Sequence, residues 1–118
     1  MQPTEQQEAE ALAAYLRIRG YDFTHIPNET GSSPEAKRRA IRMKRAGVSK
    51  GFCDYLIFAE GKRIAIELKR RKGGRASPEQ KKWLEVLAAH GFDAAVCHGR
   101  DEAVEFIEEV IGVGNERS

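Results

Sequence analysis

The sequence has 118 residues, 41% of them hydrophobic, which is enough for one modest core and too few for two domains. No apolar run approaches membrane-spanning length, and the amino-terminal residues lack the basic start and apolar centre of an export signal. Two cysteines without a Cys-x-x-Cys pair and three scattered histidines argue against a disulfide framework and a structural zinc site. Together these features predict a soluble, cytoplasmic, single-domain protein.

Charge is distributed unevenly along the chain, although the net charge is only +2. Residues 35–75 hold 14 lysines and arginines against 4 acidic residues, and the remainder holds 6 against 14. A cationic field of this kind attracts phosphates and favours a polyanionic ligand. The alternative is a basic face that serves solubility alone.

The first predicted helix covers about residues 5–19 and ends before a glycine. Glu8 precedes Leu12 and Leu16 by four and eight positions, so helical spacing places it on the apolar side of the helix. A carboxylate in that position needs a partner or a function. Glu5 lies three residues earlier on a similar face, and favourable charge in a first helical turn is the alternative explanation for both residues.

A predicted strand over residues 21–26 leads through a loop to a second helix, which begins at Pro34 after the N-cap Ser33 and ends before Gly47. Because few apolar side chains lie in this helix, we expect it to lie on the surface and to follow a phosphate backbone. Its basic residues are Lys37, Arg38, Arg39, Arg42, Lys44 and Arg45.

A β-hairpin is predicted next, because two short apolar runs, residues 55–59 and 64–68, flank a turn that contains a glycine. With a loop of either two or four residues, the pairing places Asp54 directly across from Glu67. Side chains alternate along a strand, so Lys69 lies on the same face as Glu67.

The opposed carboxylates of Asp54 and Glu67 require compensation. Directly opposed strand residues have Cβ atoms about 5 Å apart, and at an effective dielectric constant near 20 two like charges at that distance repel by roughly 3 kcal/mol. A divalent cation such as Mg²⁺ or Mn²⁺ fits best, because it takes oxygen ligands and keeps waters that a phosphate can replace. Lys69 would point at the same place. The alternative is that Asp54 caps a strand while Glu67 and Lys69 form a solvated polar stripe.

A basic, glycine-containing loop follows the hairpin, and we expect it to grip phosphates. It lacks aromatic residues, which favours contacts with a nucleic-acid backbone over base stacking. A third helix begins after Ser77, and Gln80 completes a capping box there. The residues expected to contact nucleic acid are Lys37, Arg38, Arg42, Lys44, Arg45, Lys50, Arg70, Arg71, Lys72 and Arg75.

A strand over residues 92–97 and a final helix capped by Asp101 complete the predicted elements. Their order predicts an α/β domain with a four-stranded mixed sheet over residues 1–112, followed by a disordered tail of residues 113–118. The final helix is apolar on more than one side, so it belongs either to the core or to a dimer interface.

Asp54, the tripeptide Glu67-Leu68-Lys69 and the helix start from Ser77 to Gln80 make the chain similar to the PD-(D/E)XK nuclease superfamily. Within it, nearly the whole chain resembles the stand-alone VRR-NUC domains of phages and bacteria. The resemblance implies a restriction-endonuclease-like core. One departure is Cys53, which stands where the family usually has proline before its motif aspartate. We expect this change to affect local backbone stiffness more than metal binding.

The resemblance implies a metal site in this hairpin. Asp54 and Glu67 would bind Mg²⁺ or Mn²⁺, with the backbone carbonyl of Leu68 as a further ligand. A glutamate from the first helix would complete the ligand set, with Glu8 as the first choice and Glu5 as the second.

The resemblance also implies a reaction, metal-assisted hydrolysis of phosphodiester bonds in branched DNA such as Holliday junctions or flaps. Lys69 would position or help to deprotonate the attacking water, and Gln80 would hold that water or Lys69. Symmetric cleavage of a four-way junction would need a two-fold homodimer. The protein would then work in the cytoplasm of a bacterium or a phage-infected host. The alternatives are a nucleic-acid-binding module of the same fold that cuts nothing and a restriction-type nuclease.

Overall fold

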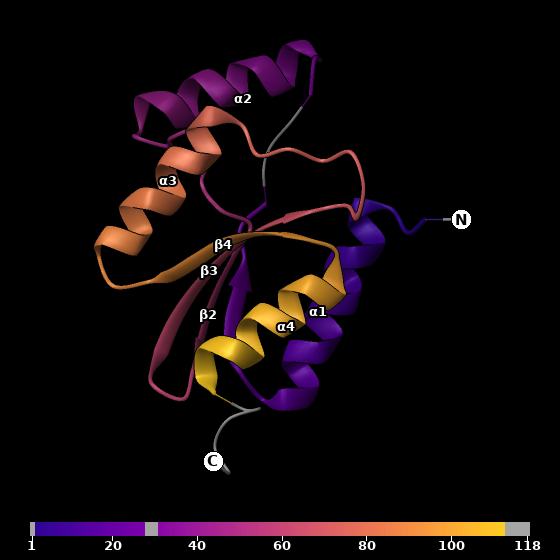
Figure 1. Cartoon of the computed structure of the whole chain (residues 1–118). Coiled ribbons are helices and arrows are strands. Elements are labelled where there is room, and N and C mark those ends of the chain that lie inside the picture. The colour runs from indigo at the N-terminus through magenta and orange to yellow at the C-terminus, as the bar shows by residue number, and fades with distance from the viewer. Residues whose placement is uncertain (1, 28–30, 113–118) are drawn as a thin grey trace.

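A computed structural model describes residues 2–27 and 31–112 of the chain (Figure 1). The predicted disordered tail, residues 113–118, lies outside the described residues. The elements follow the predicted order, and they are α1 (Glu5–Arg19), β1 (Asp22–His25), α2 (Pro34–Arg45), β2 (Tyr55–Ala59), β3 (Lys62–Lys69), α3 (Pro78–Ala89), β4 (Asp93–His98) and α4 (Arg100–Ile111).

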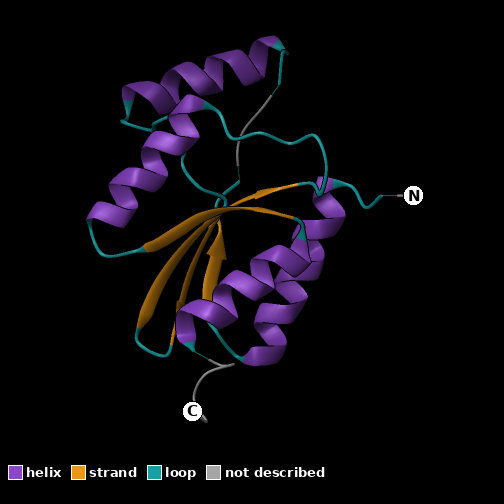
Figure 2. Cartoon of the chain, viewed as in Figure 1, coloured by secondary structure: helices purple, strands orange, loops and turns teal. Residues whose placement is uncertain are grey.

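The four strands form one sheet in the order β1-β2-β3-β4. β2 is antiparallel to both β1 and β3, and β4 runs parallel to β3. α1 and α4 pack together on one face of this sheet, whereas α3 packs over β3 and β4 on the other face (Figure 2). The predicted α/β fold, a four-stranded mixed sheet flanked by helices, is confirmed.

β3 is buried on both faces, which explains its nearly continuous apolar sequence. Ile64 and Ile66 belong to the larger hydrophobic cluster under α1 and α4. Ala65, one position out of phase, belongs to a smaller cluster with Leu84 and Leu87 of α3. Because side chains alternate along the strand, Glu67, two positions after Ala65, is directed toward α3 as well.

The loop of the hairpin contains two residues, Glu60 and Gly61, with φ angles of 52° and 77°. Two consecutive positive φ angles are characteristic of a type I′ turn, whose twist matches that of the flanking strands. Tyr55 pairs with Ile66, so the predicted register of the hairpin is confirmed.

α2 buries none of its side chains, which confirms its predicted surface position. Figure 1 shows it at the top of the molecule, next to α3 and away from the sheet. The loop after α2 contacts the first turn of α3, because a Cβ on Gly51 would lie only 2.7 Å from the Cβ of Glu79. Gly51 also has a positive φ of 87°, so two independent constraints favour glycine there.

The predicted N-cap of the final helix is wrong. Gly99 is the N-cap of α4, it offers no side-chain cap, and Asp101 lies within the first turn. The buried carboxylate of Glu8 on α1 replaces the missing cap, since its Oε1 accepts the backbone N–H of Arg100 at 2.9 Å. A side chain at position 99 would collide with Arg71, because an added Cβ would lie 2.8 Å from Arg71 Cγ.

α4 packs against the sheet and α1, so the core is the correct explanation for its apolar sides. Ala103 and Ile107 are fully buried, and Val104, Phe106 and Val110 are partly buried against the same cluster. Among the helices of residues 2–27 and 31–112, none is both long and apolar enough to cross a membrane.

Candidate active site

The predicted acidic pair lies at one end of the sheet. Asp54 immediately precedes β2, and Glu67 and Lys69 lie near the end of β3, which is antiparallel to β2. β1 and β4 also reach this end, where His25 pairs with Tyr55 and His98 pairs with Lys69. All four strands therefore contribute residues to the surroundings of the pair.

Asp54 is held by three hydrogen bonds at the end of the β2 ladder. Its backbone N–H donates to the carbonyl of Ile66 at 3.0 Å, and its own carbonyl accepts the N–H of Ile26 at 2.7 Å. Its Oδ2 accepts the N–H of Leu68 at 2.7 Å. This last bond draws the carboxylate of Asp54 across to β3, beside Glu67.

Glu67 is only 1% exposed, and burial is the main reason why its pKa is raised from 4.5 to about 8. The charge of Asp54 and a hydrogen bond with that carboxyl raise the pKa further, whereas Lys69 lowers it. The predicted proximity of the two acids is therefore present in the structure. Burial and the neighbouring charge of Asp54 thus both favour the protonated form of Glu67, and a bound cation would relieve the same penalty.

The two oxygens of Glu67 have different surroundings. Oε2 lies 3.3 Å from the Nζ of Lys69 and accepts a hydrogen bond from Nε2 of Gln80 at 2.9 Å. Oε1 is buried and accepts no hydrogen bond from any described residue. An acceptor oxygen buried without a donor, beside a second carboxylate, has the chemistry of a cation ligand.

Gln80 forms the predicted capping box and also contacts the buried acid Glu67. Its Oε1 accepts the backbone N–H of Ser77 at 2.7 Å, and its backbone N–H donates to the Ser77 side chain, which completes the predicted capping box. Its Nε2 is thereby directed at Glu67. The first turn of α3 fixes the amide, so that this helix orients the buried acid.

The two glutamates of the first helix have different surroundings. Glu8 is 2% exposed, and its oxygens accept from Arg71 Nε at 2.8 Å and from the backbone N–H of Arg100. Glu5 instead lines a cavity of about 80 Å³ together with Asp54 and Leu68. The structure thus brings Glu5, the second choice, to a cavity beside Asp54, and it directs Glu8 to other partners.

No cluster of three or more His, Cys, Asp or Glu side chains that could hold a metal occurs in the described part of the chain. The acidic pair fits a hard cation nevertheless, because Mg²⁺ is commonly held by one or two carboxylates and completes its shell with waters and substrate phosphates.

A larger cavity of about 590 Å³ opens beside Lys69, between the start of α1 and the basic loop after β3, residues 70–76. Glu5 lines both this cavity and the small one that contains Asp54. The basic side chains around it belong to Lys69, Arg70 and Arg75. An anionic substrate that entered here would lie next to Lys69, whose amine is 3.3 Å from Glu67.

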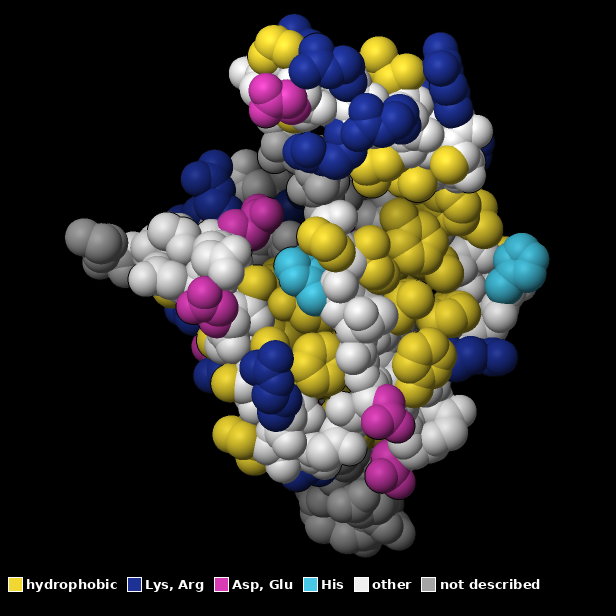
Figure 3. Space-filling model, turned by 180° about the vertical axis from the view of Figure 1, so that it is seen from behind, with side chains coloured by type: hydrophobic (Ala, Val, Ile, Leu, Met, Phe, Trp, Pro, Cys, Tyr) yellow, Lys and Arg dark blue, Asp and Glu magenta, His cyan; other side chains and the backbone are white. Residues whose placement is uncertain are grey.

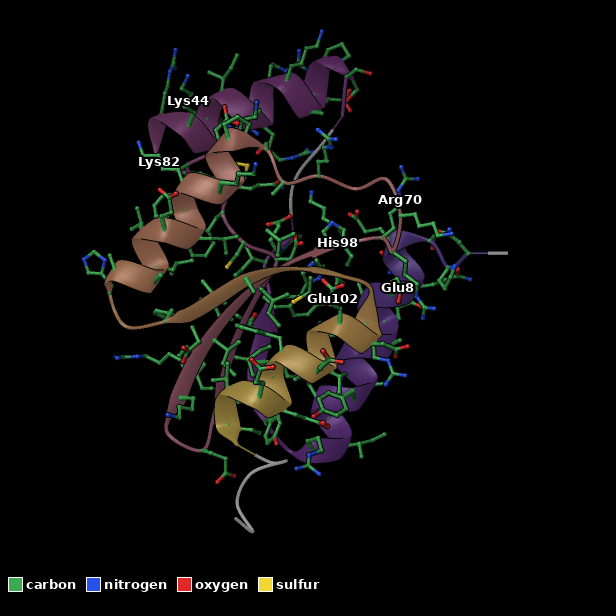
Figure 4. All side chains as sticks on the ribbon, viewed as in Figure 1. Glu8, Lys44, Arg70, Lys82, His98 and Glu102 are labelled. Atoms are coloured by element: carbon green, nitrogen blue, oxygen red, sulfur yellow. The ribbon has the colours of Figure 1, made fainter. Side chains whose placement is uncertain are left out.

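The predicted nucleic-acid contacts form two groups. Those on α2 and Lys50 are exposed on the outer helix and on the loop after it, and Figure 3 shows the cations gathered over that part of the molecule. The others are exposed on the loop after β3 (Figure 4). Arg71 differs from the rest of the set because it forms an ion pair with buried Glu8.

Two features of the site were missed in the sequence. The exposed residues Lys81 and Lys82 extend the basic surface onto α3, and Figure 4 shows Lys82 and Lys44 at the same end of the molecule. His25 stacks on Tyr55 with ring centroids 4.7 Å apart and lines the cavity beside Asp54. Neither lies in a motif, and only the approach of separate elements brings them to the site.

Known proteins share both the sequence pattern and the fold of this chain. The VRR-NUC domain family matches residues 4–101. A solved structure described as a VRR_NUC domain protein superposes with a TM-score of 0.77 at 25% sequence identity, covering 95% of this chain and 91% of that chain. None of the curated proteins matches the sequence.

Proposed function

The chain belongs to the VRR-NUC domain family, a family of nuclease-type domains, and we propose that it is a Mg²⁺- or Mn²⁺-dependent endonuclease that hydrolyses phosphodiester bonds in DNA. The observation that carries this proposal is the buried Oε1 of Glu67, which has no donor among the described residues and lies in a side chain beside Asp54. A cation bound there would reduce the repulsion between the two acids and would give the buried oxygen a partner.

Asp54, Glu67 and the carbonyl of Leu68 are the proposed ligands of the cation. Of the two first-helix glutamates, Glu5 is the better candidate for the remaining protein ligand, because it shares a cavity with Asp54, whereas both oxygens of Glu8 have other partners. A bound Mg²⁺ or Mn²⁺ lowers the pKa of a coordinated water and shields the charge that develops on a phosphate.

Lys69 and Gln80 prepare the site for a water nucleophile. The amine of Lys69, 3.3 Å from Glu67, can orient a water and stabilise the hydroxide formed from it. Gln80 holds the carboxylate of Glu67 in a fixed orientation through its helix cap. Catalytic geometry of this kind depends on side chains that cannot rotate freely, and Lys69 is only 14% exposed.

We propose branched DNA, such as a Holliday junction or a flap, as the substrate. Basic side chains lie both on α2 and on the loop after β3, so two separate groups of cations can contact two segments of phosphate backbone. No inserted recognition element occurs among residues 2–27 and 31–112, which favours structure over base sequence as the feature that is bound.

We further propose that the protein acts as a homodimer, since a four-way junction presents two symmetry-related strands and one chain offers one site. The uncovered part of the sheet face next to α3 is a candidate interface. Phe58 of β2 is 43% exposed and Val86 of α3 is 37% exposed. Figure 3 shows hydrophobic side chains gathered on this side of the molecule, below the cations.

Incubation of a labelled four-way junction with Mn²⁺ tests the enzymatic proposal. We expect the wild type to cleave the junction and Lys69→Ala to lose activity by at least about 100-fold while still binding it. Lys62→Ala, at the exposed opposite end of the same strand, is the matched control and should cleave normally.

The competing functions predict different results in the same assay. If wild type and Lys69→Ala bind alike and neither cleaves with Mn²⁺ or Mg²⁺, the chain is a binding module. Cleavage of plain linear duplex at one recurrent sequence would instead indicate a restriction-type nuclease.

A further inference from the structure

The basic loop, residues 70–76, is fixed to the rest of the protein at two points. It contains two glycines and no large apolar side chain, so packing alone cannot hold it. Arg71 Nε donates to Oε2 of Glu8 at 2.8 Å, on α1. The carbonyl of Gly74 lies 3.0 Å from Nε2 of His98, at the end of β4.

The loop lies directly against Lys69. A Cβ on Gly74 would be 2.9 Å from the Cβ of Lys69, so the two backbones approach as closely as a glycine permits. The carbonyl of Lys69 accepts the N–H of Gly99 at 2.7 Å, and His98 is the partner of Lys69 in the parallel ladder. The backbone at the end of β4 therefore holds the strand that carries Lys69, and the side chain of His98 contacts the loop that lies over it.

Glu102 binds the backbone of His98. Its Oε1 accepts the backbone N–H of His98 at 2.9 Å and lies 3.5 Å from Nδ1 of the ring (Figure 4). A backbone carbonyl can only accept a hydrogen bond, so Nε2 must carry a proton for the contact with Gly74. The hydrogen bond to Gly74 therefore directs Nε2 at the loop, while Glu102 holds the backbone that carries the ring.

We propose that His98 is a positioning residue that holds the basic loop closed beside Lys69. Its hydrogen bond to Gly74 keeps Arg70 and Arg75 on the rim of the cavity that Lys69 also lines. The phosphate backbone that these cations grip is the substrate proposed above, so this part of the inference rests on the proposed function. The closure of the loop itself does not.

Limited digestion with trypsin tests the closure without any nucleic acid, because the loop contains four basic residues as cleavage sites. We expect His98→Ala to be cut in the loop about fivefold faster than the wild type, the effect of losing one hydrogen bond. His98→Gln, whose amide can donate to the same carbonyl, should restore most of the resistance. Equal rates for wild type, Ala and Gln variants would overturn the proposal.

Two further variants separate the loop from general destabilisation. Gly74→Ala leaves His98 intact but forces the loop away from Lys69, so it should also accelerate cleavage in the loop. His90→Ala, which changes an exposed histidine at the end of α3, should leave the rate unchanged. Faster cleavage throughout the chain in His98→Ala, without preference for the loop, would contradict a positioning role.

Kinetics on junction DNA test the functional part. Loss of the loop's grip should raise the KM of His98→Ala about fivefold and change kcat by less than twofold, with recovery in His98→Gln. A fall in kcat at unchanged KM would overturn the assigned role. If the wild type cleaves no DNA, the proposed function fails, and the trypsin result still decides whether His98 closes the loop.

Discussion

Glu67 combines almost complete burial with a neighbour of the same charge, and its raised pKa has consequences for stability. The pKa of Glu67 is about 8 in the folded protein and 4.5 for the free side chain. Between these two pH values the folded state therefore keeps a proton that the unfolded state releases. The free energy of unfolding therefore falls as pH rises from about 4.5 to about 8, because the folded protein must bear the cost of ionising buried Glu67. Below about pH 4.5 Glu67 is protonated in both states and this cost is absent.

Replacement of the acid by its neutral amide removes this penalty. In EDTA at pH 8 we expect Glu67→Gln to melt several degrees above the wild type, whereas at pH 4.5 the two should differ little. Adding Mn²⁺ at pH 8 should raise the Tm of the wild type only. Thermal unfolding followed by circular dichroism measures this, with exposed Glu79→Gln as control. A variant less stable than the wild type at pH 8 would refute the argument.

Residues within one hairpin could be predicted from the sequence, but contacts between distant segments could not. Asp54 and Glu67 were brought together by the short turn between them, because the two-residue loop determines the register. Helical spacing predicted that Glu8 is buried, and it is. Its partners, Arg71 and the N–H of Arg100, belong to segments far away in the chain, so the periodicity could not distinguish a metal ligand from a structural acid.

At the scale of elements, Glu8 connects three of them. It lies on α1, caps the first turn of α4 and fixes the basic loop through Arg71. We expect Glu8→Ala to lower the free energy of unfolding by about 1–3 kcal/mol, because a buried charge-assisted contact is lost and a helix loses its cap. Chemical denaturation measures the change. Glu10 is an exposed acid on the same helix, so Glu10→Ala should change the free energy of unfolding by close to zero.

Glu5 should show the opposite behaviour. Because it lines the cavities beside Asp54 and Lys69 without such buried partners, Glu5→Ala should reduce cleavage of DNA far more than stability. The reverse result, with Glu8→Ala stable and inactive, would restore Glu8 as the proposed ligand.

Helix starts with a local cap were predictable, whereas the start of α4 was not. Thr4, Ser33 and Ser77 each accept a hydrogen bond within their own first turn, so that the sequence contains the whole signal. α4 begins at Arg100 after the N-cap Gly99 and takes its side-chain cap from another helix, so Asp101 looked like the better candidate. The mixed sheet followed from the element order, but only the structure shows that β4 joins beside β3.

The two faces of the whole molecule are covered unequally. α1 and α4 cover one face of the sheet, whereas on the other face α3 packs over β3 and β4. Phe58, near the turn of the hairpin, remains 43% exposed on that second face although its ring contacts Phe92. An apolar surface of this kind, beside cations that would meet DNA, is typical of a surface that a second protein chain covers.

If that second chain is another copy, the mass in solution should be twice the 13.2 kDa of one chain. Phe58→Glu should then reduce it to one chain, because a buried unpaired charge at an interface costs several kcal/mol. Ile18→Glu, at an 85% exposed site on α1, introduces the same charge away from this face and should leave the dimer intact. Light scattering coupled to size exclusion measures all three. A wild-type mass of 13.2 kDa at micromolar concentration would refute the dimer. If Phe58→Glu is a monomer, it should make single nicks in a junction where the wild type makes paired cuts.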